Sequence, residues 1–345
     1  MERIAVWNTA FLGDAVLTLP LIQSLKRHFP EAAIDFYVRG GLGPLFAAHP
    51  DIARVFAYAK RGEHGGLSGV RRMGGEVKAR RYDLWVNAHT SLRSALICRM
   101  SDAPVRVGYN EGVLSSLVCT RRVPRLFGKR DEVERLLALL EPLDVPLTET
   151  WPRIVVAEEI AREAEAFFAD ISGPVLGMHP GSVWATKRWP AGYFAAVGAK
   201  ALRNGSRVLL FAGPGEESIA AEVRERITAE AGDSGLTDLS GKLDLPRLAA
   251  WIGRLSCYLT NDSGPMHLAW TQRVPTVALF GPTVREWGFF PRGERTTVFE
   301  VPLACRPCGL HGPQQCPKGT HDCMRRIDPE EVWGKVAQEL GLQRQ

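Results

Sequence analysis

Short apolar runs alternate with longer amphipathic stretches along the whole chain. The runs have four to seven residues, the length of buried strands, and the stretches between them carry apolar residues at helical spacing. The runs include Ile4–Trp7, Leu84–Asn87, Val175–His179, Val208–Ala212 and Val274–Phe280. Strands that alternate with helices predict parallel sheets covered by helices on both faces, which is an α/β architecture.

The alternating series divides in two. Three prolines fall within residues 142–152, and an acidic helix is predicted directly after them, over Glu158–Phe168. We therefore predict a doubly wound, Rossmann-like domain over residues 1–155 and a second one over 156–330, facing each other across a cleft. The remaining segment, 331–345, is predicted to form a C-terminal helix that packs back toward the N-terminal domain. A chain of 345 residues is long enough for each domain to have its own core.

Composition narrows the class of protein. Hydrophobic residues make up 45% of the chain and charged residues 23%, as in globular proteins. The apolar runs are too short to cross a membrane, and the N-terminus lacks the apolar core of a signal peptide, so we expect a cytoplasmic protein. The net charge of +5 is mild, and no long basic run indicates nucleic-acid binding.

Four of the seven cysteines lie close together near the C-terminus. The spacing of Cys305 and Cys308 is that of a zinc-binding pair, whereas Cys316 and Cys323 lie seven residues apart. The four could hold a structural metal, pack a loop as reduced thiols, or form a disulfide, which is less common in the cytoplasm. The sequence leaves these alternatives open.

The strongest chemical signal is the segment from Tyr258 to Leu268, where an apolar strand leads through a polar turn into a helix. The turn contains Asp262, Ser263 and Gly264, and the helix carries His267. Ser263 or Asp262 can cap the helix, and the free N–H groups at its start would then attract an anion such as phosphate. Taken alone, the turn is better interpreted as a well-capped helix start, but similar turns follow other predicted strands.

Three further turns in the second half follow strand ends. One contains Ser182 and Lys187, a hydroxyl and a cation suited to a diphosphate. Another brings Glu217 to a helix start, where it can accept hydrogen bonds from ribose hydroxyls or simply favour the helix dipole. The third contains Leu243, which can form the wall of a base pocket. Together these turns predict a bound nucleoside diphosphate at the carboxyl ends of the strands.

In the first half, the turn after the first strand ends in Gly13 and Asp14. Asp14 can be an N-cap, or a general base for a hydroxyl nucleophile at the mouth of the cleft. The pattern G-x-G-x-x-G is absent from the sequence, which argues against a nicotinamide cofactor.

At these residues the chain resembles the bacterial lipopolysaccharide heptosyltransferases of glycosyltransferase family 9. The resemblance is most specific at Gly13–Asp14, at Lys187–Pro190 and at Asp262–His267. The segment Ser91–Ala95, with Arg106–Tyr109 and the cysteine pattern, resembles the heptosyltransferase II branch. The resemblance implies the two-domain GT-B fold and an inverting, metal-independent transfer without a cofactor. The donor would be ADP-heptose and the acceptor a heptosylated Kdo–lipid A of the lipopolysaccharide core.

The resemblance also implies a role for each site residue. Asp14 would be the base, and Lys187 would offset charge on the departing ADP as part of the catalytic machinery. The residues implied to bind the donor are Ser182, Lys187, Glu217, Leu243, Asp262, Ser263, Gly264 and His267. Those expected at the acceptor are Thr9, Gly13, Arg93, Arg80 and Lys78, the three cations suiting phosphates or Kdo carboxylates.

Two alternatives remain open at this stage. A family 9 transferase with another donor or acceptor sugar would carry the same turns, and a sugar-nucleotide epimerase shares the two-domain architecture. Because the implied acceptor is lipid-anchored, we expect a monomer that associates peripherally with the cytoplasmic face of the inner membrane.

Overall fold

The computed structural model describes residues 1–60, 62–111 and 114–342. These form two compact units. Unit 1 comprises Met1–Val156 together with Glu286–Gly288, and unit 2 comprises Ala157–Arg285 together with the chain from Phe289 onward. The three residues 286–288 are therefore packed with unit 1 although both flanking segments belong to unit 2.

Unit 1 is built on a six-stranded parallel sheet in the order β3-β2-β1-β4-β5-β6. Its strands are β1 (Arg3–Asn8), β2 (Ala33–Arg39), β3 (Arg54–Tyr58), β4 (Leu84–Asn87), β5 (Val105–Tyr109) and β6 (Arg121–Val123). Its helices are α1 (Leu12–Leu17), α2 (Leu19–His28), α3 (Gly43–Phe46), α4 (Gly66–Ala79), α5 (Leu92–Met100), α6 (Ser115–Val118) and α7 (Glu132–Ala138). The central strands are buried, as expected for a sheet covered on both faces.

Unit 2 repeats this plan with the order β12-β11-β10-β7-β8-β9. Its strands are β7 (Val175–His179), β8 (Arg207–Leu210), β9 (Leu236–Asp238), β10 (Cys257–Asn261), β11 (Thr276–Phe280) and β12 (Thr296–Glu300). Its helices are α8 (Glu158–Ala169), α9 (Ala191–Arg203), α10 (Glu217–Ala231), α11 (Leu245–Ile252), α12 (Gly264–Thr271), α13 (Asp322–Arg325) and α14 (Pro329–Glu339).

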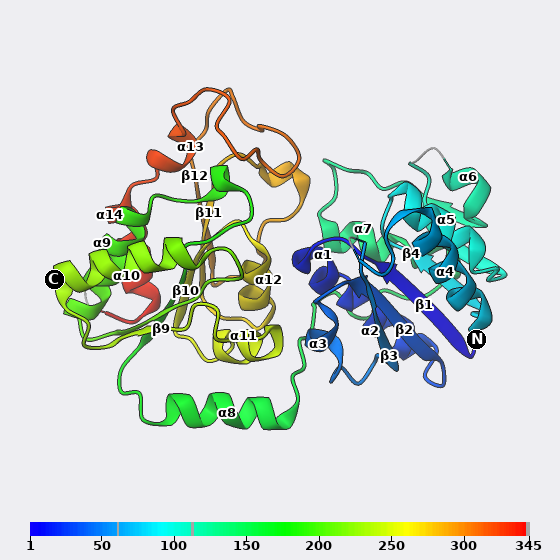
Figure 1. The fold of residues 1–345 in the computed structure, drawn as a ribbon, viewed down its shortest axis with the longest axis horizontal. Helices are drawn as coiled ribbons and strands as arrows, with labels where there is room; N and C mark the ends of the chain where they lie inside the picture. The colour runs from blue at the N-terminus through cyan, green and yellow to red at the C-terminus, as the bar shows by residue number, and fades with distance from the viewer. Residues whose placement is uncertain (61, 112–113, 343–345) are drawn as a thin grey trace. The chain divides into compact units, whose positions relative to one another are not determined.

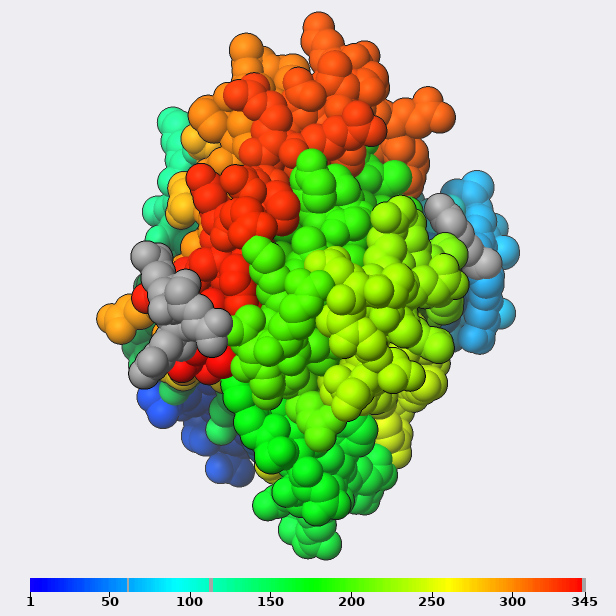
Figure 2. All heavy atoms as spheres, turned by 90° about the vertical axis from the view of Figure 1, so that its left-hand side faces the viewer, coloured from blue at the N-terminus to red at the C-terminus, as the bar shows by residue number. Residues whose placement is uncertain are grey.

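Helices cover both faces of the sheet in unit 2. Figure 1 shows α9, α10 and α14 on one face and α11 and α12 on the other. Figure 2 shows the first of these faces, where the C-terminal helix α14 (red) lies beside the green α9. Their apolar side chains join the strands in one core that includes Val197, Ile227 and Val336.

The C-terminal helix corrects one sequence-based expectation. The sequence predicts a helix in 331–345 that packs toward the N-terminal domain, whereas α14 packs on α9, β10 and β11 of unit 2. Val332 and Val336 are fully buried in the core of unit 2, so its apolar side already has a partner there. Residues 343–345 of the predicted segment lie outside the described residues.

Other elements also differ from the sequence prediction. The apolar spacing over Ala15–His28 predicts a single helix. The structure has two helices there, because Pro20 has no N–H to donate and so interrupts the hydrogen-bond ladder near Thr18. Residues 115–125 are predicted to be irregular but contain α6 and β6, and β12 and α13 are not predicted at all. These are short elements, or strands at a sheet edge, whose apolar patterns are weak.

Candidate active site

Asp14 lies in the first turn of α1, directly after β1 ends. It is the third residue of that helix, and Phe11 occupies the N-cap position, so the interpretation of Asp14 as an N-cap is wrong. The Asp14 carboxylate accepts a hydrogen bond from the backbone N–H of Phe11 at 3.1 Å. This bond fixes one carboxylate oxygen, while the side chain as a whole is only half-buried.

The electrostatic surroundings of Asp14 favour its protonated form. Desolvation and, secondly, the neighbouring Glu132 carboxylate raise the pKa of Asp14 from 3.8 to about 7. The N–H of Phe11 and the guanidinium of Arg125 oppose this shift. A carboxylate with a pKa near neutrality can accept a proton and release it again at physiological pH, which is the requirement for a general base.

The turn before Asp14 is held by buried polar groups. Asn8 Nδ2 donates to the hydroxyl of Thr18 at 2.9 Å, and that hydroxyl donates to the carbonyl of Asp14 at 2.7 Å. On the other side, the hydroxyl of Thr9 lies 3.1 Å from Nδ1 of His89. Burial, with smaller effects of nearby cations, lowers the pKa of His89 to about 4, so its imidazole is neutral. Gly13, which has no side chain, is buried next to Asp14 in the chain.

The three cations predicted at the acceptor do not lie together. Arg93 is in the first turn of α5, and its Nη1 donates to the carbonyl of Lys60 at 3.4 Å. Lys78 and Arg80 lie at the end of α4, where the carbonyl of Arg80 accepts from Arg3 at the start of β1. That is the amino-terminal edge of the sheet, opposite to Asp14. Lys78 is paired there with Asp102 at 2.7 Å. The structure therefore separates Lys78 and Arg80 from the Asp14 turn.

In unit 2, Lys187 and Asp262 come together at the adjacent carboxyl ends of β7 and β10. The Lys187 Nζ lies 2.5 Å from Oδ2 of Asp262, and the hydroxyl of Thr283 donates to the same oxygen at 2.7 Å. Both charged side chains are largely shielded, with 11% and 8% of their side-chain surface exposed. Asp262 therefore fixes the position of the ammonium group in a partly desolvated site, where its field is stronger than in water.

The side chain of Asn261, at the end of β10, holds the loop that carries Lys187 through hydrogen bonds. Asn261 Oδ1 accepts from the N–H of Trp189 at 3.0 Å, and its Nδ2 donates to the carbonyl of Pro180 at 2.8 Å. Within the loop, Arg188 Nε donates to the carbonyl of Ser182 at 2.7 Å, and Ser182 is buried. The two ends of the loop thus share one amide side chain, which limits the positions that Lys187 can take.

Ser263, Gly264 and His267 lie at the start of α12. Ser263 is the N-cap residue, but its hydroxyl lies 3.3 Å from that of Thr260 and makes no capping bond to the helix. The first N–H groups of α12 are therefore left without a side-chain cap. His267 is buried, and its Nδ1 accepts a hydrogen bond from the indole N–H of Trp270 at 3.0 Å. Desolvation lowers the pKa of His267 to about 4, so the ring is neutral and its proton is on Nε2.

Two adjacent glutamates follow β8, and they have different surroundings. Glu216 Oε2 lies 3.0 Å from Nε2 of His179 and accepts from the N–H of Gly213 at 3.0 Å. Although burial opposes it, the bond with His179 lowers the pKa of Glu216. Glu217 is exposed, and its Oε2 accepts from the N–H of Gly215 at 2.8 Å. Its other oxygen faces the turn at Gly241, two residues before the half-buried Leu243.

The C-terminal cysteines are free thiols. Burial and, secondly, the neighbouring Cys308 raise the pKa of Cys323 to about 11, and Cys305 and Cys316 act in the same direction. Among the described residues, no group of three or more His, Cys, Asp or Glu side chains has the arrangement of a metal site. Of the three alternatives that the sequence leaves open for these cysteines, the geometry of the described residues gives no support to a structural metal.

Several residues that act on Asp14 or Asp262 in the structure are not part of any recognisable sequence motif. Glu132 and Arg125 act on Asp14 from more than 100 residues away, and Thr283 reaches Asp262 from the loop after β11. Asn261 directly precedes Asp262 in the sequence, and this position beside a predicted site residue is the one sequence signal that could have identified it. The remaining three become neighbours only through the fold.

Two doubly wound units with polar turns at the carboxyl ends of their strands define a two-domain protein of the GT-B class. The model of glycosyltransferase family 9 (heptosyltransferase) matches residues 70–314, and the chain belongs to this family.

Named relatives agree with this assignment. The chain is 28% identical over 293 residues to lipopolysaccharide heptosyltransferase 2 of Salmonella typhimurium, covering 81% of this chain and 83% of that protein. It superposes on a family 9 glycosyltransferase of Veillonella parvula with a TM-score of 0.86 and 27% identity, over 98% of this chain and 97% of that one. It also superposes on the structure of E. coli ADP-heptose lps heptosyltransferase II, with a TM-score of 0.79 and 24% sequence identity. That superposition covers 99% of this chain and 98% of the E. coli chain. This last likeness confirms the fold.

In the described part of the chain, we find no helix with both the length and the apolar character needed to span a bilayer.

Proposed function

We propose that the protein transfers L-glycero-D-manno-heptose from ADP-heptose to a heptosyl-Kdo2-lipid A inner core, with inversion at the anomeric carbon. The observation that carries this proposal is Asp14, a carboxylate with a pKa of about 7 at the carboxyl end of β1. The relatives support the choice of donor and acceptor, since they are lipopolysaccharide heptosyltransferases and one of them is the E. coli ADP-heptose lps heptosyltransferase II.

In the proposed reaction Asp14 takes the proton of the attacking acceptor hydroxyl. The hydroxyl oxygen forms a bond to the anomeric carbon of the heptose as the bond from that carbon to the ADP oxygen breaks. A single displacement from the opposite face inverts the anomeric configuration. The hydrogen bond from Phe11 holds one Asp14 oxygen in place and leaves the other for the proton.

Negative charge develops on the departing diphosphate, and unit 2 supplies the groups that stabilise it. Lys187, fixed by Asp262, would lie against the phosphates, and the uncapped N–H groups of α12 from Gly264 would donate to their oxygens. Ser182 and Ser263 would add hydroxyls, and the Nε2–H of neutral His267 would add a further donor. Because cationic and N–H groups provide this stabilisation, we expect transfer to proceed at the same rate in EDTA as in Mg²⁺.

The nucleoside and the acceptor would occupy the remaining groups. Glu217 keeps one carboxylate oxygen free of the Gly215 bond and can accept from a ribose hydroxyl, with Leu243 beside the base. On the acceptor side we propose Thr9, Gly13 and Arg93, whereas Lys78 and Arg80 lie at the wrong edge of the sheet for contact with the attacking hydroxyl. The lipid-linked acceptor would bring the protein, as a monomer, to the cytoplasmic face of the inner membrane.

The test is release of ADP from ADP-heptose, with and without heptosyl-Kdo2-lipid A, by the wild type and by Asp14→Ala. We expect acceptor-dependent release that Asp14→Ala reduces by at least 10³-fold. Asp102→Ala removes an exposed carboxylate that pairs with Lys78 and should release ADP at the wild-type rate, which makes it a matched control. Release without dependence on the acceptor, or full activity of Asp14→Ala, would overturn the proposal.

A further inference from the structure

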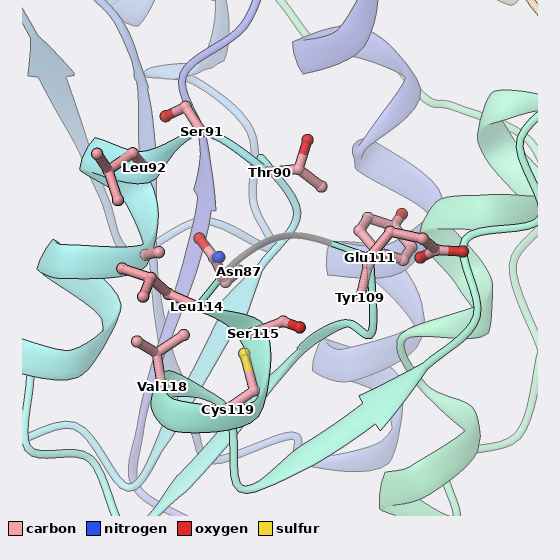
Figure 3. Close-up of a pocket in the computed structure, with 11 residues that line it drawn as sticks. Asn87, Thr90, Ser91, Leu92, Tyr109, Glu111, Leu114, Ser115, Val118 and Cys119 are labelled. Carbon is pink, nitrogen blue, oxygen red and sulfur yellow. The ribbon is translucent and has the colours of Figure 1, made fainter.

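Unit 1 contains a cavity of about 340 Å³ at the carboxyl ends of β4 and β5. This volume falls within the range of small-molecule pockets, roughly 300–1,000 Å³. Figure 3 shows Leu92 and Ser91 of the α5 segment on one side and Leu114, Val118 and Cys119 on the other. The walls are therefore mainly apolar, and they come from α5 and from the segment around α6.

Two of the residues that line the cavity carry polar atoms without a partner in the described part of the chain. Asn87 Oδ1 and the hydroxyl of Tyr109 are buried, and neither makes a hydrogen bond to any described residue. Buried polar atoms without partners are rare in folded proteins because they lose their bonds to water on folding. A ligand that fills the cavity with hydroxyl groups beside these two atoms would restore the missing bonds.

The charge of the lining restricts the ligand further. Among the described residues that line the cavity there is no lysine, arginine or histidine, and Glu111 is the one charged side chain. Both oxygens of Glu111 accept from the backbone N–H of Arg125, at 2.9 and 2.8 Å. A ligand carboxylate or phosphate would meet a like charge here and no cation among the lining residues, since Arg125, 5.6 Å from the ring centroid of Tyr109, lies outside the lining, so the lining selects against anions.

The cavity is connected to the turn that carries Asp14. The hydroxyls of Ser91, at the cavity, and Ser94 lie 2.9 Å apart, and Ser94 Oγ lies 3.0 Å from Nδ1 of His89. The same His89 nitrogen lies 3.1 Å from the hydroxyl of Thr9, in the turn before Asp14. In addition, Asn87 is the register partner of Trp7 in β1. A ligand in the cavity therefore lies one strand away from Asp14.

From these observations we propose that the cavity binds a neutral pyranose ring of the acceptor. Such a ring presents C–H groups to the apolar walls and hydroxyls to Asn87 and Tyr109. This inference rests on the proposed function and makes it more specific. In heptosyl-Kdo2-lipid A the heptose is neutral whereas each Kdo carries a carboxylate, so the heptose of the acceptor is the sugar that fits.

Cys119 can report occupancy, because it lines the cavity and is a free thiol with 8% of its surface exposed. The protein is treated with iodoacetamide, and modification of Cys119 is followed by peptide mass spectrometry in the presence of different probes. We expect delipidated heptosyl-Kdo2 oligosaccharide to slow modification at least fivefold, and Kdo2 alone to have no effect. Equal protection by Kdo2 or by dodecyl maltoside, or no protection by an oligosaccharide that is turned over, would overturn the inference.

Two variants test the same site through kinetics. Ala95→Phe fills the cavity from α5, and Asn87→Leu removes the unpartnered oxygen at nearly constant size. Both should raise KM for the heptosylated acceptor at least tenfold and leave the affinity for ADP unchanged, while Ala79→Phe, on the exposed end of α4, is the matched control. An unchanged KM in Asn87→Leu would also overturn the inference.

The two proposals fail in different ways. Acceptor-dependent ADP release without protection of Cys119 leaves the proposed function intact and removes the pyranose site. Protection of Cys119 without any release of ADP supports the site and removes the proposed transfer reaction.

Discussion

Asp14 and Lys187 each depend on a neighbour that is remote in the sequence. Glu132 raises the pKa of Asp14, and Asp262 fixes the ammonium of Lys187 at 2.5 Å. The two effects are opposite in kind. Desolvation and the like charge of Glu132 raise the pKa of Asp14, whereas the opposite charge of Asp262 fixes the position of the Lys187 ammonium group. The pKa of Asp14 therefore lies near neutrality, where its carboxylate can take up and release a proton, and the ammonium group of Lys187 is held in one position.

The pH dependence of transfer should report the ionisation of Asp14. A base acts only when deprotonated, so kcat/KM should be constant above about pH 7 and fall about tenfold per unit below it, because the pKa of Asp14 is raised to about 7. Initial rates between pH 5 and 9 at limiting acceptor measure this limb. A rate that stays flat down to pH 5 would show that a group with an ordinary carboxylate pKa, or no base at all, controls the reaction.

Substitution of Lys187 should slow the chemical step. Removal of one group that stabilises a developing charge typically lowers kcat by about 10²–10³-fold, and we expect Lys187→Ala to fall in this range. Steady-state kinetics at saturating ADP-heptose give the value, and Lys200→Ala, on α9 and paired with Glu330, is the control. A Lys187→Ala enzyme with wild-type kcat would place the diphosphate elsewhere in unit 2.

At the scale of elements, the short segment Glu286–Gly288 is docked on the start of α7. The N–H of Glu132 donates to the carbonyl of Gly288 at 2.9 Å, and Arg135 Nη2 donates to the carbonyl of Trp287 at 2.7 Å. Arg135 and Glu132 are both buried, and they also form an ion pair. The same Glu132 raises the pKa of Asp14, so this docking holds in place a group that controls the proposed base.

Gly288 is required at this contact for two reasons. Its φ of +80° is in the left-handed region, and a Cβ would lie 2.4 Å from the Cα of Asp131. Gly288→Ala should therefore lower the free energy of unfolding by about 1–3 kcal/mol, measured by urea denaturation. Gly75→Ala, in α4 with nothing within 4 Å of the added Cβ, should instead raise it by about 0.5–1 kcal/mol. Equal effects of the two substitutions would contradict a tight contact at Gly288.

For the whole molecule, the two units separate the proposed tasks. Asp14 and the pyranose cavity belong to unit 1, and the proposed diphosphate groups belong to unit 2. Each unit has its own apolar core, one around Trp7 and Trp85 and the other around Trp189 and Phe194. Donor binding should therefore be separable from the supply of the base.

Thermal unfolding with ADP tests this separation. A ligand at 100 times its Kd stabilises the folded state by about 2.7 kcal/mol, so ADP should raise the Tm of the wild type. Asp14→Asn should keep the full shift, and Lys187→Ala should lose most of it, as followed by differential scanning fluorimetry. Loss of the shift in Asp14→Asn would show that the base also takes part in binding the nucleotide.

The class of fold follows from local pattern. Buried parallel strands need continuous apolar runs, and these are visible at Leu84–Asn87 and Val175–His179, whose observed bounds are those predicted. The break at Thr18 and the edge strand β12 were missed. A proline in the second turn and a half-buried edge strand leave a weaker trace in the apolar periodicity than a buried central strand does.

The sequence by itself determined the turns that follow the strands, because their small, capping and charged residues are contiguous: Asp14, Lys187 and Asp262 all come from such segments. The tertiary structure decided which of them meet. It joined Lys187 to Asp262, brought Glu132 to Asp14, separated Lys78 and Arg80 from that turn, and enclosed the cavity at Asn87. The pairing of charged side chains and their desolvation depend on distances between segments that are remote in the sequence. The order of residues along the chain does not specify these distances.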